Sequence, residues 1–262
     1  MLLDSGQDAA TFSAYRAGFP ESLAARLRAI GFGTGKQRVL DLCCGFGDLA
    51  RMFAVGECQV VALDASSSAL EQARHTCGGL NVEFVEAQAE CTGLPDQSFD
   101  AVIAGQCWHW LERRRAAAEM ARLVKPGGLL VICHFDWLPL PGNVVAATEE
   151  MIRKWNPVWP MGGGTGIYPQ WLGDMAVAGF DDLETFSYDV AHPHTRSEWR
   201  ARLRDTVGIA GRLSPQLIHD FDQDLSRMLD TRFPGEPLLV PHRVWAACGR
   251  RKIKPVHAPS LP

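Results

Sequence analysis

The stretch 39–50, with the sequence VLDLCCGFGDLA, constrains this chain more than any other. Apolar residues lead into Asp41 as in a buried strand, Gly45 and Gly47 follow in a short turn, and apolar residues at helical spacing begin at Leu49. This order predicts a strand, a tight loop and a helix. Glycines let backbone N–H groups approach a ligand closely, and a helix N-terminus favours negative or electron-rich groups. We therefore expect a cofactor at this turn.

The segments around this stretch alternate as in a parallel α/β sheet. Apolar runs and periodicity predict strands at 37–42, 59–63, 81–86, 99–104 and 128–135, and helices at 46–55, 66–77 and 111–123. Lys125, Pro126, Gly127 and Gly128 predict a firm stop before the fifth strand. The later part of the chain is less regular, with helices expected at 144–155, 169–178, 196–209 and 215–229 and strands at 182–190 and 238–248.

Composition excludes several classes of protein. The chain has 262 residues and a formal net charge of −4, which argues against a nucleic-acid surface. Its eight cysteines lie scattered in apolar segments without a CxxC pair, so we expect reduced core thiols rather than disulfides or a zinc site. Neither a secretory start nor an apolar run of membrane-spanning length is present. The sequence thus predicts a cytoplasmic protein without membrane or nucleic-acid partners, a monomer or homodimer.

Two nucleotide-type ligands fit the glycine loop. Gly45, Gly47 and Ala50 satisfy the dinucleotide pattern GxGxxA, and Asp64 lies where that pattern places a ribose-binding acid. Asp41 fits less well, because a dinucleotide-binding strand normally stays apolar close to the pyrophosphate. A ligand with an ammonium-bearing amino-acid end would instead favour a carboxylate there.

Several motifs together resemble the class I S-adenosylmethionine-dependent methyltransferases, in particular the type 11 group that acts on small molecules. VLDLCCGFG is similar to the first motif of that family, usually VLDLGCGTG, and Asp64 ends the second strand as the family's ribose-binding acid does. LPDQSFDAV, QCWHW and EMARLVKPGGLL follow in the family's order. The resemblance implies a Rossmann-like, seven-stranded, mostly parallel sheet with helices on both faces, an antiparallel last strand and helical lid insertions.

The resemblance also implies the residues that would bind S-adenosylmethionine. They are Tyr15, Arg16, Asp41, Cys43, Gly45, Gly47, Asp64, Ala65, Gln88, Ala89 and Gln106. Cys43 departs from the family pattern, which has glycine there, and Gln88 stands where an aspartate often accepts from the adenine amino group. Asp64 could instead cap the following helix, Asp41 could be a buried acid bonded to loop amides, and the N-terminal pair could dock the first helix.

Candidate catalytic and acceptor-binding residues follow the fourth and fifth predicted strands. His109 and His134 are candidate general bases, and Trp108, Asp136, Trp137 and Trp159 are candidates for the acceptor pocket. Trp108 and Trp110 could instead be packing residues. Trp137, Trp155, Trp159 and Trp171 predict either an aromatic pocket in the insertion or simply its core. His192 and His194 lack a third metal ligand in the sequence, so we expect a loop and no metal there.

The sequence thus predicts a helical cap over 1–36, a methyltransferase domain over 37–250 with lid insertions at 138–166 and 192–234, and a flexible tail over 251–262. Its expected reaction is methyl transfer to an O or N atom, less often C or S, of a small hydrophobic or aromatic molecule. Two alternatives remain at this point. They are a nicotinamide-dependent oxidoreductase and a cofactor-binding scaffold with a non-methylating reaction.

Overall fold

The computed structural model describes residues 18–159, 162–204, 206 and 213–253. These residues form two compact units. Unit 1 contains 18–19, His134–Ile167 and Ser187–Trp245, and unit 2 contains Pro20–Cys133, Tyr168–Phe186 and 246–253. Tyr15 and Arg16, two of the expected cofactor contacts, lie outside the described residues.

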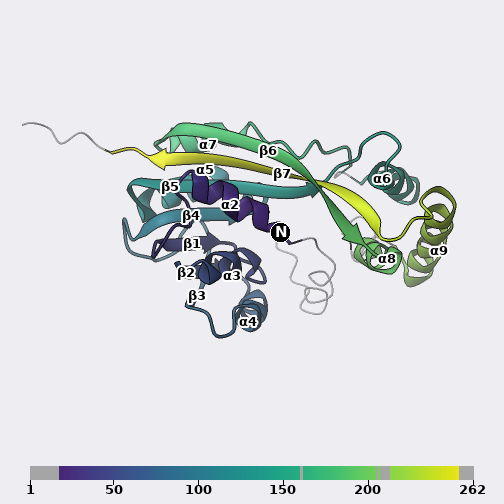
Figure 1. Ribbon diagram of the computed structural model, residues 1–262, viewed down its shortest axis with the longest axis horizontal. Helices are drawn as coiled ribbons and strands as arrows, with labels where there is room; N and C mark the ends of the chain where they lie inside the picture. Colours follow the sequence, from purple (N-terminus) through teal and green to yellow (C-terminus); the bar gives the residue numbers. More distant parts are fainter. Residues whose placement is uncertain (1–17, 160–161, 205, 207–212, 254–262) are drawn as a thin grey trace, which may run out of the picture. The chain divides into compact units, whose positions relative to one another are not determined.

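One sheet of seven strands runs through the protein in the order β3-β2-β1-β4-β5-β7-β6. The strands β1 to β5 pair in parallel, whereas the arrow of β7 runs against those of β5 and β6 (Figure 1). This confirms the expected α/β class with a mostly parallel sheet and an antiparallel last strand. The strands are Arg38–Leu42 (β1), Gln59–Asp64 (β2), Val82–Glu86 (β3), Phe99–Gly105 (β4), Val124–Trp137 (β5), Phe180–His194 (β6) and Leu238–Arg251 (β7).

Unit 2 carries the first five strands and two groups of helices. Helices α2 (Glu21–Ala29), α3 (Asp48–Val55) and α4 (Ser67–Thr76) pack on one another in turn, whereas α5 (Arg113–Leu123) packs against α7 (Trp171–Val177). The central strands β1 and β4 are buried along almost their whole length. Such continuous apolar runs are typical of parallel strands that helices cover on both faces.

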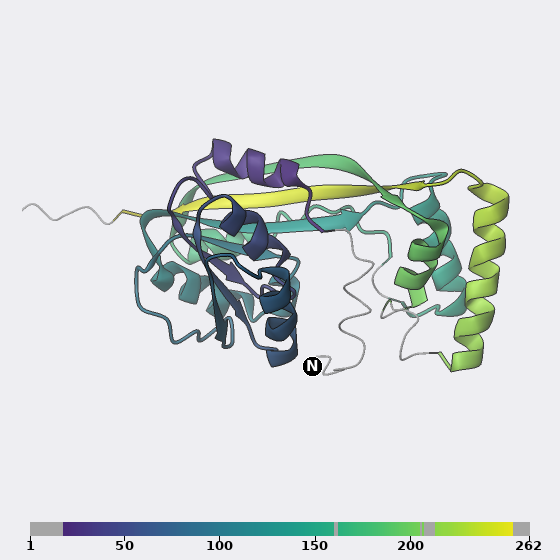
Figure 2. The same cartoon turned by 60° about the horizontal axis from the view of Figure 1, so that its bottom comes forward.

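Unit 1 is built from three helices and the outer ends of β5, β6 and β7. Helices α6 (Val144–Trp155), α8 (Arg196–Arg204) and α9 (Pro215–Arg232) gather around one apolar core (Figure 2). Trp199, Phe221 and Leu225 are fully buried in this core, and Trp137 and Trp155 pack against it. Trp171, which the sequence grouped with these tryptophans, instead lies in unit 2 and stacks on Tyr168 at 4.2 Å between ring centroids.

Several elements differ in their bounds from the sequence prediction, and for α3 and β5 the reason is identifiable. Helix α3 begins at Asp48 rather than at 46, because Gly47 has a φ of 85° that no right-handed helix contains. Strand β5 already begins at Val124, so the predicted turn at Lys125 lies within it as an irregularity in the pairing with β4. Strand β6 extends beyond the predicted 182–190 at both ends.

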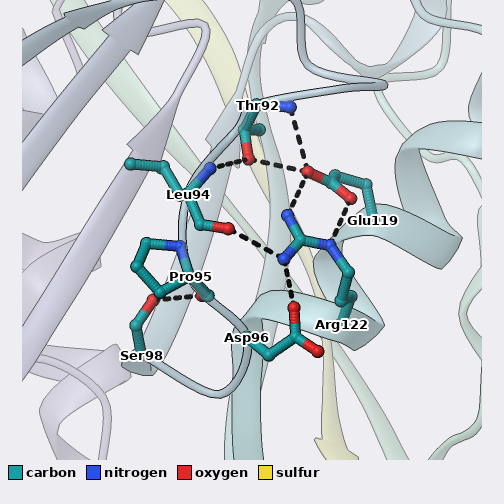
Figure 3. A network of polar contacts seen from close by, with 7 residues as sticks. All are labelled: Thr92, Leu94, Pro95, Asp96, Ser98, Glu119 and Arg122. Atoms are coloured by element: carbon teal, nitrogen blue, oxygen red, sulfur yellow. Dashed lines mark hydrogen bonds and ion pairs between the residues drawn. The ribbon is translucent and has the colours of Figure 1, made fainter.

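A polar network ties α5 to the segment between β3 and β4 (Figure 3). Glu119 accepts hydrogen bonds from the backbone N–H and the hydroxyl of Thr92, at 2.9 and 2.7 Å. Arg122 donates to Glu119, to the carbonyl of Leu94 and to the carboxylate of Asp96. These bonds, first of all those from Arg122, lower the pKa of Glu119 to about 2.

We expect Glu119→Gln to flatten the acid limb of the stability curve. A carboxylate whose pKa is lower in the folded than in the unfolded protein stabilises the fold above its unfolded pKa, and the stabilisation is lost as the pH falls from about 4.5 to about 2. For this partly solvated network the expected loss in the variant at neutral pH is about 1–2 kcal/mol. Urea unfolding between pH 2.5 and 7 measures it, with the exposed Glu71→Gln as control. Parallel pH profiles for wild type and Glu119→Gln would contradict this assignment.

Candidate cofactor site

The glycine loop is tied to the end of β2. The N–H of Cys44 donates to the carbonyl of Leu63 at 2.9 Å, and the N–H of Gly47 donates to the carbonyl of Cys44 at the same distance. The loop is therefore a closed turn held against the neighbouring strand, and α3 begins directly behind it at Asp48.

Asp64 joins the loop to the segment after β2. One of its carboxylate oxygens accepts from the N–H of Gly45 and the other from the N–H of Ser66, both at 2.9 Å. The helix-cap interpretation of Asp64 is wrong, because the side chain of Ser66 caps α4 by accepting from Ala69. Each carboxylate oxygen has a second lone pair, so Asp64 can accept further hydrogen bonds from a ligand while it holds the loop.

The loop lies where the strand order reverses. Chain order runs outward from β1 to β3 and then returns to β4 on the other side of β1, so the carboxyl ends of β1 and β4 form the switch point at which open α/β sheets bind ligands. Two residues other than glycine have positive φ directly after these strands, Cys43 at 55° and Gln106 at 60°. Such backbone costs about 1–3 kcal/mol per residue and concentrates at functional sites. Sequence reasoning named both residues but not this shared strain.

The side chain of Cys43 is accommodated by a second thiol. Cys43 lies beside Cys107, whose thiol donates to the carbonyl of Leu42 at 3.5 Å. The contact with Cys43 and burial raise the pKa of the Cys107 thiol well above its usual value. All eight cysteines are free, and five of them are buried, as the sequence predicts.

Asp41 is the most unusual ionisable group of the site. It is 1 % exposed, and its Oδ2 atom has no hydrogen-bond partner among the described residues. Burial raises the pKa of its carboxyl to about 8, opposed by a hydrogen bond from the N–H of Ala50. A buried acid with an unsatisfied oxygen is suited to a cationic ligand, because a positive charge nearby would favour its ionised form.

These residues fit a nucleoside cofactor with a cationic end. At Gly45 an added Cβ would meet nothing within 4 Å, so the loop faces open space there. Asp64 offers carboxylate lone pairs of the kind that ribose hydroxyls bind, and Asp41 offers an unsatisfied buried oxygen. The donor set therefore fits S-adenosylmethionine, and the dinucleotide pattern does not account for Asp41.

Comparison with known protein families identifies the type of domain that contains the glycine loop. Residues 39–128 match the model of a methyltransferase domain. This segment is a methyltransferase domain. The resemblance to class I S-adenosylmethionine-dependent methyltransferases is thereby confirmed.

Curated relatives agree with this assignment, and solved structures share the fold. The ubiquinone/menaquinone biosynthesis C-methyltransferase of Hahella chejuensis is 35 % identical, over 44 % of this chain and 56 % of the relative. The chain spans about half the length of the curated relatives that it matches. A structure described as a type II methyltransferase from Anaeromyxobacter dehalogenans has a TM-score of 0.62 at 22 % identity, covering 92 % of this chain and 99 % of the other.

A second solved structure has a bound ligand. It is phosphoethanolamine N-methyltransferase 2 from Haemonchus contortus in complex with phosphomonomethylethanolamine and S-adenosylhomocysteine. Its TM-score is 0.57 at 18 % identity, over 95 % of this chain and 58 % of that chain. At these identities the solved structures show a shared fold and nothing more.

The remaining predicted contacts of the methyltransferase domain lie at the same strand ends. Ala65 is half-buried directly after β2, Gln88 is exposed and Ala89 is 4 % exposed just beyond β3. The backbone of Gln88 pairs with Cys91 in an isolated bridge, which closes this segment into a turn. Gln88 thus lies beyond the carboxyl end of β3, the strand that pairs with β2 next to Asp64.

The QCWHW segment after β4 separates into buried and exposed residues. Trp108 is fully buried, and its indole N–H donates to Asp174 of α7 at 3.1 Å. It therefore packs in the core of the methyltransferase domain, and the function proposed below does not use it. His109 is exposed and contacts the exposed ring of Trp110 at 4.5 Å between centroids.

Unit 1 contains the other candidates. His134 is 2 % exposed, and its Nδ1 lies 3.3 Å from a carboxylate oxygen of Asp136. Trp137 donates its indole N–H to the buried carboxylate of Glu149 at 3.1 Å. Trp159 is 7 % exposed and belongs to the core of unit 1, so the core interpretation describes its packing.

The described residues contain neither a metal-binding cluster nor a helix that could span a membrane. They contain no group of three or more His, Cys, Asp or Glu side chains placed to hold a metal ion. Among their helices none combines the length and apolar character needed to cross a bilayer.

The two loop glycines should respond differently to alanine. At Gly47 a Cβ would lie 3.1 Å from both Ala73 Cβ and Cys77 Sγ, and φ is 85°, so Gly47→Ala should lower the free energy of unfolding by about 2–4 kcal/mol. Gly45→Ala meets no atom and should cost only about 1 kcal/mol, from its φ of 53°. Its Cβ should instead occupy cofactor space and weaken S-adenosylhomocysteine binding. Chemical denaturation and calorimetry measure both effects, and equal stability losses in the two variants would contradict them.

Proposed function

We propose that this protein is an S-adenosylmethionine-dependent methyltransferase that acts on a small molecule. The glycine loop at the switch point between β1 and β4, held by Asp64, is the observation that carries the proposal. The match of residues 39–128 to a methyltransferase domain and the relatives that bear this activity in their names support it.

Within this proposal each residue around the loop has a part in holding the cofactor. Asp64 accepts from the ribose hydroxyls, Gln88 and Ala89 contact the adenine, and the backbone at Gly45 lies against the ligand. Asp41 faces the methionine end, next to Cys43 and Gln106. Gly47 and Ala65 shape the turns on either side. Tyr15 and Arg16, which lie outside the described residues, remain expected cofactor contacts.

S-adenosylmethionine supplies a methyl group that its sulfonium centre already activates. The protein therefore has mainly to hold the acceptor in line with the reacting bond and to exclude water. Orientation of this kind corresponds to effective molarities of about 10⁵–10⁸ M. No metal is required for this chemistry.

Carbon is one of the candidates for the atom that accepts the methyl group. The sequence ranked O and N above C, but the curated relatives that match include C-methyltransferases. Those matches cover less than half of this chain. They therefore support the identity of the cofactor more than the identity of the acceptor. We propose a small-molecule acceptor whose methylated atom is C, O or N.

His134 is our first candidate for a general base, and His109 is the second. The contact between His134 and Asp136 supports this order, because a carboxylate on one ring nitrogen fixes the orientation of the imidazole. Asp136 would then act through His134 rather than on the acceptor itself. Trp137 directly follows Asp136 in the chain, and we place it in the acceptor pocket for that reason.

For an acceptor that must lose a proton, we expect His134→Ala to lower kcat by about 10²–10⁴-fold with little change in cofactor affinity. His109→Ala should have a smaller effect, and the exposed His75→Ala serves as control. If the His109 and His134 variants both retain full turnover, general-base catalysis by these residues is excluded.

Two assays test the proposal as a whole. Calorimetry should show binding of S-adenosylhomocysteine and no binding of NAD, whereas the reverse result would establish the oxidoreductase alternative. A screen with radiolabelled S-adenosylmethionine and panels of phenols, quinols, amines and enolisable acids should then show transfer to one class. Binding without transfer across all panels would favour the scaffold alternative.

A further inference from the structure

Unit 1 contains a cluster of basic side chains that the proposed function does not use. It consists of His192 and His194 of β6, Arg202 of α8 and His242 of β7, and we name it the histidine–arginine cluster. The centroids of the His192 and His194 rings are 4.7 Å apart, and each lies about 6 Å from the ring of His242, at 6.0 and 6.2 Å. Three strand and helix elements thus bring four basic groups together in one place.

His242 is neutral and fixed. Its Nδ1 lies 3.0 Å from the carbonyl of Val240, which can only accept, so Nδ1 carries the hydrogen. Its Nε2 then accepts from a guanidinium N–H of Arg202 at 3.2 Å. Burial, and next the charge of Arg202, lower the pKa of His242 to about 3. His242 therefore acts as a neutral support that orients Arg202.

The guanidinium of Arg202 also lies over two indole rings. Its Cζ atom is 5.1 Å from the ring centroid of Trp137 and 5.5 Å from that of Trp199. Both rings are themselves fixed, because Trp137 donates to Glu149 and Trp199 donates to Thr148. A guanidinium held between aromatic faces and a neutral imidazole is pre-organised, which reduces the entropy lost when it binds a ligand.

Two ring nitrogens of this cluster lack partners among the described residues. They are Nδ1 of His192 and Nε2 of His194, and both atoms are buried. His194 as a whole is 4 % exposed, whereas His192 and Arg202 are partly exposed, so the cluster reaches the surface. Buried polar atoms without partners are rare, and an unfilled ligand position is one of their recognised explanations.

Arg202 supplies the permanent positive charge beside the two histidines. Burial and then the charge of Arg202 lower the pKa of both rings, to about 4 for His194, and His242 of β7 adds no negative charge. The acid acting on both of them is Glu198 of α8, whose side chain is exposed. An oxyanion is the ligand that complements this arrangement.

We propose that the histidine–arginine cluster is a binding site for the carboxylate group of a small molecule, with Arg202 as the main contact and His192 and His194 as further hydrogen-bond donors. A carboxylate suits it better than a phosphate group, because the cluster offers one permanent positive charge and a phosphate monoester carries nearly two negative ones. The flat guanidinium fork matches the two carboxylate oxygens. This inference goes beyond the proposed function and is tested without the cofactor.

Carboxylate binding should be linked to proton uptake. An anion beside His192 and His194 stabilises their charged forms and raises their pKa, so the complex binds more protons than the free protein. Affinity should therefore increase as the pH falls from 8 to 6. Arg202 stays charged and His242 stays neutral over this range, and Glu198 is ionised throughout, so the linkage belongs to the two histidines.

The experiment uses calorimetry on the full chain with benzoate as probe, and with benzyl alcohol and inorganic phosphate as comparisons. We expect benzoate to bind more tightly than either, with affinity increasing at least about threefold from pH 8 to pH 6. Heats in two buffers of different ionisation enthalpy should show net proton uptake. Equal binding of benzyl alcohol, preferential binding of phosphate, or no binding of benzoate would each overturn the proposal.

A matched pair of variants assigns the site. Arg202→Gln should weaken benzoate binding at least tenfold, whereas Arg204→Gln removes the same charge from the same helix at a residue that pairs with Asp222, and should change it less than twofold. His194→Gln should reduce the proton uptake. If Arg202→Gln fails to fold, Arg202→Lys, which keeps the charge and loses the fork, should still bind less tightly than wild type. Undiminished binding in the Arg202 variants would overturn the assignment.

Discussion

Replacing Asp64 with alanine should weaken S-adenosylhomocysteine binding by at least about 100-fold. Under the proposed function its carboxylate accepts two ribose hydroxyls, and hydrogen bonds to a charged group contribute about 1.5–3 kcal/mol each. The same carboxylate holds the N–H groups of Gly45 and Ser66, so the variant should also loosen the loop. Calorimetric titration of S-adenosylhomocysteine measures the combined effect.

Asp64→Asn separates the two contributions. The amide keeps the shape and one acceptor oxygen, so it should retain part of the loop's hydrogen bonding while losing the charge. We expect a weaker but still measurable affinity, about tenfold below wild type. The exposed Asp48→Asn, in the first turn of α3, is the matched control and should change affinity less than threefold. Wild-type affinity in Asp64→Ala would show that the cofactor site lies elsewhere.

Replacing Asp41 with asparagine should make the protein more stable at pH 8 and should flatten its stability curve. The carboxyl of Asp41 has a pKa of about 8 when folded, against an ordinary value of 3.8, so between these values the folded protein binds more protons than the unfolded chain. Stability must then decrease as the pH rises through this range. Four pH units correspond to an upper limit of about 5 kcal/mol.

Urea unfolding from pH 4 to pH 9 tests this effect. The free-energy difference between Asp41→Asn and wild type should grow steadily with pH and level off above about 8. Asp181→Asn serves as control here, because its side chain is exposed and should leave the slope unchanged. Parallel profiles for the wild type and the Asp41 variant would mean that Asp41 is ionised in the folded protein at neutral pH.

The two acids of the site thus have opposite tasks. Asp64 is partly exposed and holds the loop through two backbone N–H groups, which leaves it ready to accept from a ligand. Asp41 is buried with an unsatisfied oxygen, and a cationic ligand would ionise it. The fold maintains this strained arrangement near a loop that also contains positive φ at Cys43 and Gln106.

Much of the secondary structure could be predicted from local patterns. The expected strand at 59–63 and the observed Gln59–Asp64 differ by one residue, and α6 was predicted with its observed bounds, Val144–Trp155. Buried parallel strands are continuous apolar runs, and helices have caps and periodic faces, so each can be recognised within its own segment. The glycine loop and Asp64 could be predicted for the same reason, since their spacing lies within one strand–helix–strand unit.

The sequence alone determined the α/β class, the glycine loop and the position of the acid that follows it. Only the tertiary structure decided how Cys43 is accommodated, because its neighbour Cys107 lies in the segment after β4, far away in the sequence. The same holds for the histidine–arginine cluster, whose members come from β6, α8 and β7. Sequence periodicity reports which face of an element is apolar, but not which distant side chain meets it. Long-range contacts of this kind depend on strand order and register, which are properties of the whole packed sheet.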